Sequence, residues 1–328
     1  MTDRPRLVLH IGAGKCGSSA IQQFLVVNAE SLADDGFLVP GRYLEPKPEG
    51  CGQHLAYFED GIASPGFGDD LMAKLTALHD HAVEHDFGAV ILSAENLINP
   101  KGFVDLFVPA RELFDITVVA YVRRQDDFVI SAWQQWQIKQ HDDFWEYYGR
   151  HRGGVNWHRQ LEPWRRNYGR PAVVVRRYSP DALVGGDVVA DFCAVIEADL
   201  SRHRRPDRAN RSLHERFNPM IARYRRELFT SIHDNRFYTF LGDVLGEHAY
   251  RGYRGSTVLT LSERRMVMAD HAAANDLLKA EYFPELGEAP LFPPPGPADV
   301  HVSSEPLMDE ATALSFLAMF RLWERRDG

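Results

Sequence analysis

One lysine stands inside a glycine-rich turn near the start of the chain. The segment LHIGAGKCGSS, residues 9–19, joins an apolar run to a stretch with helical spacing. Main-chain N–H groups at a helix N-terminus attract an anion, and the Lys15 ammonium adds a full positive charge. The alternative is a tight strand-to-helix turn with an incidental lysine. The pattern predicts a loop that binds a phosphate-like group through Gly14, Lys15, Cys16, Gly17, Ser18 and Ser19.

This loop differs from the phosphate loop of kinases and ATPases at two positions. That consensus requires Gly where Leu9 stands and Ser or Thr where Cys16 stands. A thiol is a poor ligand for magnesium, which takes oxygen ligands. The apolar run 89–92 is followed by Ser93-Ala94-Glu95, with no Asp directly after the run to complete a magnesium site. We therefore expect the loop to bind its anion without a metal.

A second signal for an anion follows the apolar run 116–122. Arg123 stands at the C-terminal end of this predicted strand, where open α/β sheets bind their ligands. Ser131 lies in the second turn of the helix expected next, so both side chains could reach one phosphate. The alternative is that Arg123 and Arg124 form a solvated pair beside the acidic residues that follow them.

The elements that position these residues can be predicted from apolar runs separated by helical segments. Buried strands are expected at 7–11, 89–92, 116–122 and 172–175, with a short extended piece at 37–40. Continuous apolar strands alternating with helices are typical of a parallel sheet covered on both faces. The expected fold class is α/β, a P-loop-like three-layer fold with a central parallel sheet flanked by helices and helical additions at the C-terminus.

The chain is expected to form one domain over residues 1–328. Residues 41–69 are rich in Pro and Gly and are predicted to be a long surface loop that could cover the active site. Residues 255–328 are predicted to be a mostly helical C-terminal extension.

The composition is that of a globular protein with an acidic balance, with 45% hydrophobic residues and a net charge of −9. This charge argues against a general nucleic-acid binder, which needs a basic face. We find no apolar stretch long enough to cross a membrane and no secretion signal. The cysteines, Cys16, Cys51 and Cys193, show no metal-ligand spacing. We therefore expect a cytoplasmic protein that binds no nucleic acid and spans no membrane, while its oligomeric state stays open.

Several segments, in order along the chain, resemble motifs of the sulfotransferase superfamily, and of its bacterial branch in particular. In LHIGAGKCGSSAIQQFL, Lys15-Cys16-Gly17-Ser18-Ser19 stands where the family's 5′-phosphosulfate loop usually has Lys-Thr-Gly-Thr-Thr. The segment VVAYVRRQDDFVISAW is similar to the family's 3′-phosphate strand, loop and helix. VVVRRYSPDALVGGDVVADF and NRSLHERF resemble the downstream strand-helix pattern and the Asn-x-Ser-Leu element of bacterial members.

The resemblance implies transfer of sulfonate from 3′-phosphoadenosine 5′-phosphosulfate (PAPS) to a hydroxyl or amine, with release of 3′-phosphoadenosine 5′-phosphate (PAP). It implies that the glycine loop holds the 5′-phosphosulfate, that Arg123 and Ser131 hold the 3′-phosphate, and that Asn210 and Ser212 help to bind the nucleotide. No metal is needed, because Lys15 and main-chain N–H groups can stabilise the leaving phosphate. The acceptor is expected to be a bacterial glycan or another small molecule.

The acceptor must lose a proton as it attacks sulfur, so a general base is expected. Glu95, in ILSAENL, follows the predicted strand 89–92 and resembles the Glu that several carbohydrate sulfotransferases use as base. The alternative for Glu95 is a residue that begins a helix. His54, in CGQHLAY, is the second candidate, since other branches use His, and the two residues could act together. The alternative for His54 is a solvated histidine on a surface loop.

The sequence leaves open the roles of an arginine cluster and an aromatic stretch, and it allows two alternative functions. An arginine of the cluster over 202–211 is expected to close over the nucleotide, because guanidinium suits bidentate phosphate recognition. The aromatic side chains over 133–168 are assigned mostly to packing, with a saccharide-binding lid as the alternative. The alternative functions are a nucleotide kinase or other P-loop phosphotransferase, and a catalytically dead nucleotide-binding protein.

Overall fold

The computed structural model describes residues 4–46, 53–99, 102–206, 212–252, 255–302 and 308–325. The chain divides into two compact units. The first unit comprises Met1–Arg123, Asn156–Ala209 and Leu277–Gly287, and the second comprises Arg124–Val155, Asn210–Asp276 and Glu288–Gly328. The single domain expected over 1–328 stays a prediction.

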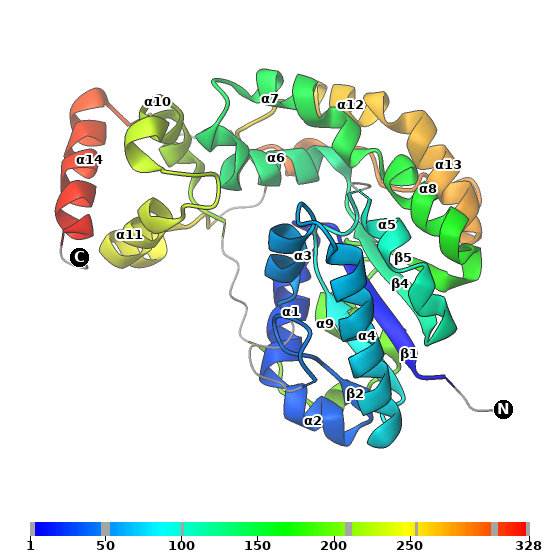
Figure 1. Ribbon diagram of the computed structural model, residues 1–328. Coiled ribbons are helices and arrows are strands. Elements are labelled where there is room, and N and C mark those ends of the chain that lie inside the picture. The colour runs from blue at the N-terminus through cyan, green and yellow to red at the C-terminus, as the bar shows by residue number, and fades with distance from the viewer. Residues whose placement is uncertain are drawn as a thin grey trace. The chain divides into compact units, whose positions relative to one another are not determined.

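The first unit is built on a five-stranded sheet in which every neighbouring pair of strands is parallel (Figure 1). The spatial order is β2-β3-β1-β4-β5. The strands are β1 (Arg6–Gly12), β2 (Phe37–Leu38), β3 (Ala89–Ser93), β4 (Asp115–Val122) and β5 (Val173–Arg177). The predicted α/β fold class with a central parallel sheet is confirmed.

The apolar runs form strands because this sheet is buried on both faces. Leu9 of β1 lies beside Leu92 of β3 on one side and Val118 of β4 on the other, and all three side chains are fully buried. A strand covered on both faces has no solvated side, so apolar residues occupy successive positions instead of every second one.

Helices flank this sheet. In the first unit they are α1 (Ser18–Val27), α2 (Ala29–Asp34), α3 (Leu55–Gly61), α4 (Phe67–Glu84), α5 (Phe103–Leu106), α8 (Trp157–Tyr168) and α9 (Val188–Ile196). Helix α4 packs against β3, α8 packs against β4 and β5, and α1 packs against α9. Helix α13 (Ala272–Tyr282) contains one of the points at which the chain passes from one unit to the other.

Residues 41–69 are not one continuous loop, which corrects the sequence prediction. They contain helix α3 and the start of α4 at Phe67, while residues 47–52 lie outside the described part of the chain. Phe58 is fully buried and its ring contacts those of Phe67, Phe103 and Phe107. Burial of this aromatic cluster stabilises a helix that the local Pro and Gly content does not favour.

The described part of the second unit is mainly helical. Its helices are α6 (Gln125–Gln135), α7 (Phe144–His151), α10 (Asn218–Leu228), α11 (Arg236–Leu245), α12 (Leu261–Asp270) and α14 (Glu310–Glu324). The buried Arg264 of α12 donates hydrogen bonds to Asp126 and Asp127 of α6 and so joins these two helices. Residues 255–328 contain helices α12, α13 and α14, while their assignment to one C-terminal extension stays a prediction.

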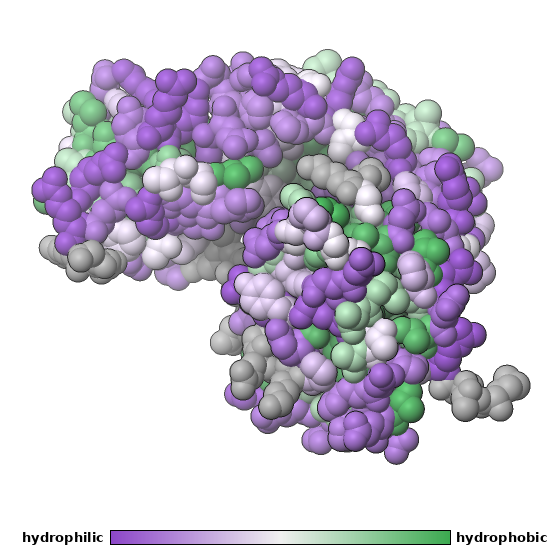
Figure 2. Space-filling model, viewed as in Figure 1, coloured by the Kyte–Doolittle hydropathy of each residue, from purple (hydrophilic) through white to green (hydrophobic). Residues whose placement is uncertain are grey.

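Hydrophilic side chains cover much of the face seen in Figure 2, with only scattered hydrophobic patches. No helix in the described ranges is both long enough and apolar enough to cross a membrane.

Candidate functional site

Three of the residues expected at the site follow three neighbouring strands of the first unit. Lys15 follows β1, Glu95 follows β3 and Arg123 follows β4, and β1 lies between the other two strands. Because the strands are parallel, these residues gather at the same edge of the sheet. The strand order also reverses at β1. After β1 the chain forms β2 and β3 on one side of it, and then crosses to form β4 and β5 on the other side. Such a switch point is where α/β sheets bind ligands.

The turn between β1 and α1 is held close to the end of β3. Gly12 has φ +108°, and a Cβ there would lie 2.4 Å from the carbonyl oxygen of Glu95. Gly17 has φ +85° and directly precedes α1. Lys15 itself adopts φ +62°, a conformation that a non-glycine residue rarely occupies and that is frequent at binding sites. The predicted strand, glycine loop and helix are therefore all present.

The environment of the Lys15 amine lowers its pKa from 10.5 to about 8. Burial is the largest cause, since it disfavours the charged form. The carboxylate of Glu95 acts in the opposite direction, and the guanidinium of Arg123 lowers the pKa further. Two cationic side chains thus influence each other beside one carboxylate, an arrangement that an anionic ligand would stabilise.

Arg123 is fixed against the glycine loop. Its Nη1–H donates to the Lys15 carbonyl over 3.0 Å, and its guanidinium lies 5.6 Å from the centre of the Tyr178 ring. The Trp157 indole N–H donates to the Arg123 carbonyl over 2.8 Å. Arg124, by contrast, forms an ion pair with Asp126 over 2.7 Å. The two arginines therefore have different roles and do not form a solvated pair.

Glu95 lies in a turn directly after β3 and does not begin a helix. The neighbouring N–H groups of Ala94 and Ile98 donate to the carbonyls of His10 and Ile11 and so fasten this turn to β1. The Ser18 hydroxyl donates to the Glu95 carboxylate. A serine expected to face the donor nucleotide is therefore joined to the candidate base.

His54 directly precedes α3, and its side chain is fully buried, so it is not a solvated loop residue. The N–H of Ser93 donates to His54 Nδ1 over 2.9 Å, which leaves the other ring nitrogen to carry the proton and donate to the Pro40 carbonyl over 3.1 Å. Burial lowers the pKa of this imidazole to about 4. Both ring nitrogens are thus used by main-chain groups, and the ring connects the start of α3 to the end of β3.

The remaining loop side chains differ in exposure. Cys16 is fully buried, and burial raises the pKa of its thiol to about 12, so the thiol is neutral at physiological pH. Ser18 is buried, whereas Ser19 is exposed. Gly14 is half-buried. The sulfur of Cys16 therefore points into the protein, and only its main-chain N–H is left to bind an anion.

Three expected nucleotide ligands belong to the second unit. Ser131 is half-buried on α6. Ser212 is exposed, and its carbonyl accepts a hydrogen bond from the Arg251 N–H. Asn210 lies outside the described residues. The structure does not test the roles assigned to these three residues.

The arginine cluster over 202–211 is described in part. Arg202 forms an ion pair with Asp35, and the main chain of Arg204 is held by both amide atoms of Asn28. Arg208 and Arg211 lie outside the described residues. Arg202 is thereby tied to the end of α2.

Most of the aromatic side chains over 133–168 belong to the core, as expected. Trp157 and Trp164 are at most 1% exposed, and Trp133 and Phe144 are also buried. Trp145 is 39% exposed and is the outward-facing exception among these five. The packing interpretation accounts for this stretch better than a saccharide-binding lid does.

Two features of the structure were missed by the sequence analysis. Tyr178, which packs beside Arg123, directly follows β5 in VVVRRYS, and its place at a strand end was the available signal. The described residues also contain two groups of side chains that lie close enough together to hold a metal ion, one of them formed by His81, Glu84 and His85. The spacing of these three residues, at i, i+3 and i+4, was visible in HAVEH.

Comparisons with known proteins add little to this description. No protein-family model matches the chain. No curated protein matches it either. A sulfotransferase from Alicyclobacillus acidocaldarius of known structure is similar with 17% sequence identity, over 67% of this chain and 91% of that chain, at a TM-score of 0.36. Similarity at this level carries no argument about activity, which depends here on the residues of the chain itself.

Proposed function

We propose that this protein is an enzyme that transfers a sulfonate group from PAPS to a hydroxyl or amine acceptor. The observation that carries the proposal is the gathering of Lys15, Arg123 and Glu95 at the carboxyl ends of three neighbouring strands. Two cations beside a glycine loop suit a donor with two phosphate-like groups, and a carboxylate suits proton removal from an acceptor. Two of the segments that resemble sulfotransferase motifs contain Lys15 and Arg123, and Glu95 resembles the Glu that several carbohydrate sulfotransferases use as base.

In the proposed reaction the acceptor oxygen or nitrogen attacks the sulfur of PAPS. A new bond forms to sulfur, the bond between sulfur and the bridging oxygen breaks, and PAP leaves with that oxygen. The Lys15 ammonium and the main-chain N–H groups at the start of α1 stabilise the negative charge that develops on the leaving phosphate. Arg123 and Ser131 are assigned to the 3′-phosphate, with Asn210 and Ser212 as further nucleotide ligands.

Glu95 is proposed as the base that takes the acceptor proton. The turn after β3 fixes its main chain, and the hydroxyl of Ser18 contacts its carboxylate. His54 is the weaker candidate, because main-chain groups use both of its ring nitrogens. We assign to His54 a structural role at the start of α3.

The proposed transfer does not depend on a metal at the loop. Where phosphate loops supply a hydroxyl to magnesium, this chain has Cys16, whose neutral thiol is fully buried. The acceptor is proposed to be a glycan or another small molecule. No described residue restricts its identity further.

The first experiment is a thermal-shift titration with PAP, followed by mass-spectrometric detection of products from PAPS and an acceptor panel. PAP should raise the melting temperature of the wild type. Lys15→Ala should lower turnover by at least about 100-fold, as loss of a preorganised donor does in other enzymes. Lys74→Ala, on α4, is the matched control and should keep wild-type turnover.

Two outcomes would favour the alternatives. Tight binding of PAP without turnover of any acceptor would indicate a dead nucleotide-binding protein. Phosphoryl transfer from ATP that requires magnesium would indicate a P-loop phosphotransferase. If Lys15→Ala retained wild-type turnover, the assignment of the loop would be wrong.

A further inference from the structure

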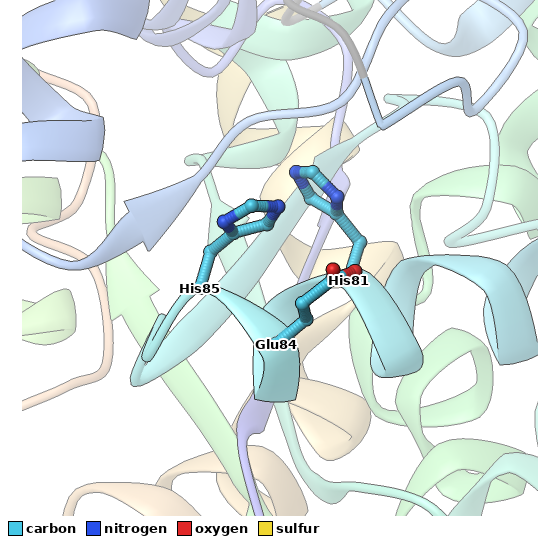
Figure 3. A group of neighbouring side chains, drawn as sticks. All are labelled: His81, Glu84 and His85. Carbon is cyan, nitrogen blue, oxygen red and sulfur yellow. The ribbon is translucent and has the colours of Figure 1, made fainter.

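The C-terminal end of helix α4 carries a group of side chains that could bind a metal ion. His81, Glu84 and His85 follow one another at i, i+3 and i+4, which places them on one side of an α-helix. One ligand atom from each lies within 4.8 Å of the other two. The centres of the two imidazole rings are 4.3 Å apart. Figure 3 shows the rings beside each other at the helix end, with the Glu84 carboxylate next to His81.

The end of the helix holds these two rings in place. Asp86 adopts φ +56°, and the following N–H of Phe87 donates to the Ala82 carbonyl over 2.8 Å, the bond that closes a Schellman motif. The chain thereby turns back, and the Phe87 ring stacks on His81 with 6.0 Å between ring centres. Its centre lies 6.4 Å from that of His85. The Phe87 ring therefore packs beside both imidazoles.

A second group in the first unit, formed by His158, Glu162 and Glu281, is less suited to a metal. The Arg165 guanidinium lies 2.7 Å from a carboxylate oxygen of Glu162 and 2.8 Å from one of Glu281. Both carboxylates are thus already neutralised by a cation. Among the described residues, Glu84 has no such ion pair with a cationic side chain, and it is exposed.

We propose that His81, Glu84 and His85 bind one divalent transition-metal ion, for which Zn²⁺ is the typical example. Two imidazole nitrogens and one carboxylate oxygen are donors that Zn²⁺ takes at about 2.0–2.2 Å. The ligand atoms now lie within 4.8 Å of one another, so binding requires the side chains to rotate to the closer spacing of a tetrahedral site. Three protein ligands leave the fourth position to water.

This metal site is separate from the proposed transfer site. Helix α4 leads into the first residue of β3, Ala89, whereas Glu95 follows the last residue of β3, Ser93. The two sites therefore lie toward opposite ends of the same strand. The metal would hold the last turn of α4 and take no part in sulfonate transfer.

The test is calorimetric titration of the full-length, chelator-treated protein with ZnCl₂. The wild type should bind one Zn²⁺ per chain. His81→Gln and His85→Gln should each weaken binding by at least about tenfold, because even partners in the outer shell of a metal site contribute 10–100-fold. His79→Gln is the matched control, since His79 lies on the same helix but interacts with Asp80.

Co²⁺ provides a second measurement that does not depend on heats of binding. The wild type should give the visible absorption band of a tetrahedral Co²⁺ site, and the double variant His81→Gln/His85→Gln should lose it. Glu84→Ala changes an exposed side chain and should weaken both signals, so it tests the site even if a histidine variant folds poorly. If the double variant, folded by circular dichroism, bound Zn²⁺ as tightly as the wild type, or if the wild type showed no saturable binding, the proposal would be wrong.

Discussion

At the scale of single residues, the lowered pKa of Lys15 gives the proposed site a specific pH dependence. The free protein should bind PAP through the protonated amine, so affinity should fall as the pH rises through about 8. Each further pH unit should weaken binding by up to about tenfold. PAP affinity measured between pH 6 and pH 10 checks this expectation.

The neighbours of Lys15 should move this midpoint in opposite directions. The charge of Arg123 lowers the Lys15 pKa, so Arg123→Gln should move the midpoint to higher pH. The charge of Glu95 raises it, so Glu95→Gln should move the midpoint to lower pH. Shifts of the same sign in both variants would show that another group controls the titration.

The choice of base can be tested with one variant of each candidate. Glu95→Gln keeps the size of the side chain but cannot accept the acceptor proton, so at a pH well below the Lys15 pKa, kcat should fall by about 100-fold or more while PAP affinity changes little. His54→Asn should instead lower the melting temperature, because the buried ring connects Pro40 to Ser93. If His54→Asn lost kcat while Glu95→Gln retained it, the order of the two candidates would be reversed.

Residue types predicted which side chains could bind an anion, but they did not predict what each side chain contacts. Lys15, Glu95 and Arg123 could be selected because chemistry at strand ends follows from the order of the apolar runs. The burial of His54 could not be predicted, since it depends on packing between segments distant in the sequence. For the same reason, the sequence could not predict the contact between Ser18 and Glu95.

At the scale of elements, the glycine loop depends on the space that Gly12 leaves open. Gly12→Ala should clash with the Glu95 carbonyl and also strain a backbone at φ +108°. Gly66→Ala is the matched control, because Gly66 has φ +79° but nothing within 4 Å of a new Cβ. Gly12→Ala should therefore lower the free energy of unfolding by about 1–3 kcal/mol more than the control does. Urea denaturation of both variants measures this difference, and equal losses would exclude a tight contact there.

The elements were predicted well where local pattern and burial agree. Each continuous apolar run became a strand, because a strand covered on both faces needs no polar side. Helix α3 was missed, since its stability comes from the contacts of Phe58 with aromatic rings on other elements. Tertiary contacts of this kind override local composition.

At the scale of the whole molecule, the two proposed sites should respond differently to a chelator. EDTA treatment of Zn²⁺-loaded protein should lower the melting temperature, because the metal binds the folded state. The same treatment should leave PAPS turnover unchanged, and added Mg²⁺ should not increase it. Parallel melting and turnover assays check both expectations. Loss of turnover in EDTA with recovery in Mg²⁺ would support a phosphotransferase instead.

The rarity of lysine makes the amine in the glycine loop a target for chemical labelling. The chain has only 6 lysines beside 31 arginines. At pH 8 about half of the Lys15 amines are unprotonated, given a pKa of about 8, whereas an ordinary lysine with a pKa of about 10.4 is almost wholly protonated. An amine-directed acylating reagent should therefore modify Lys15 before the other lysines, and bound PAP should protect it. A single labelling experiment would thus locate the anion site without any knowledge of the acceptor.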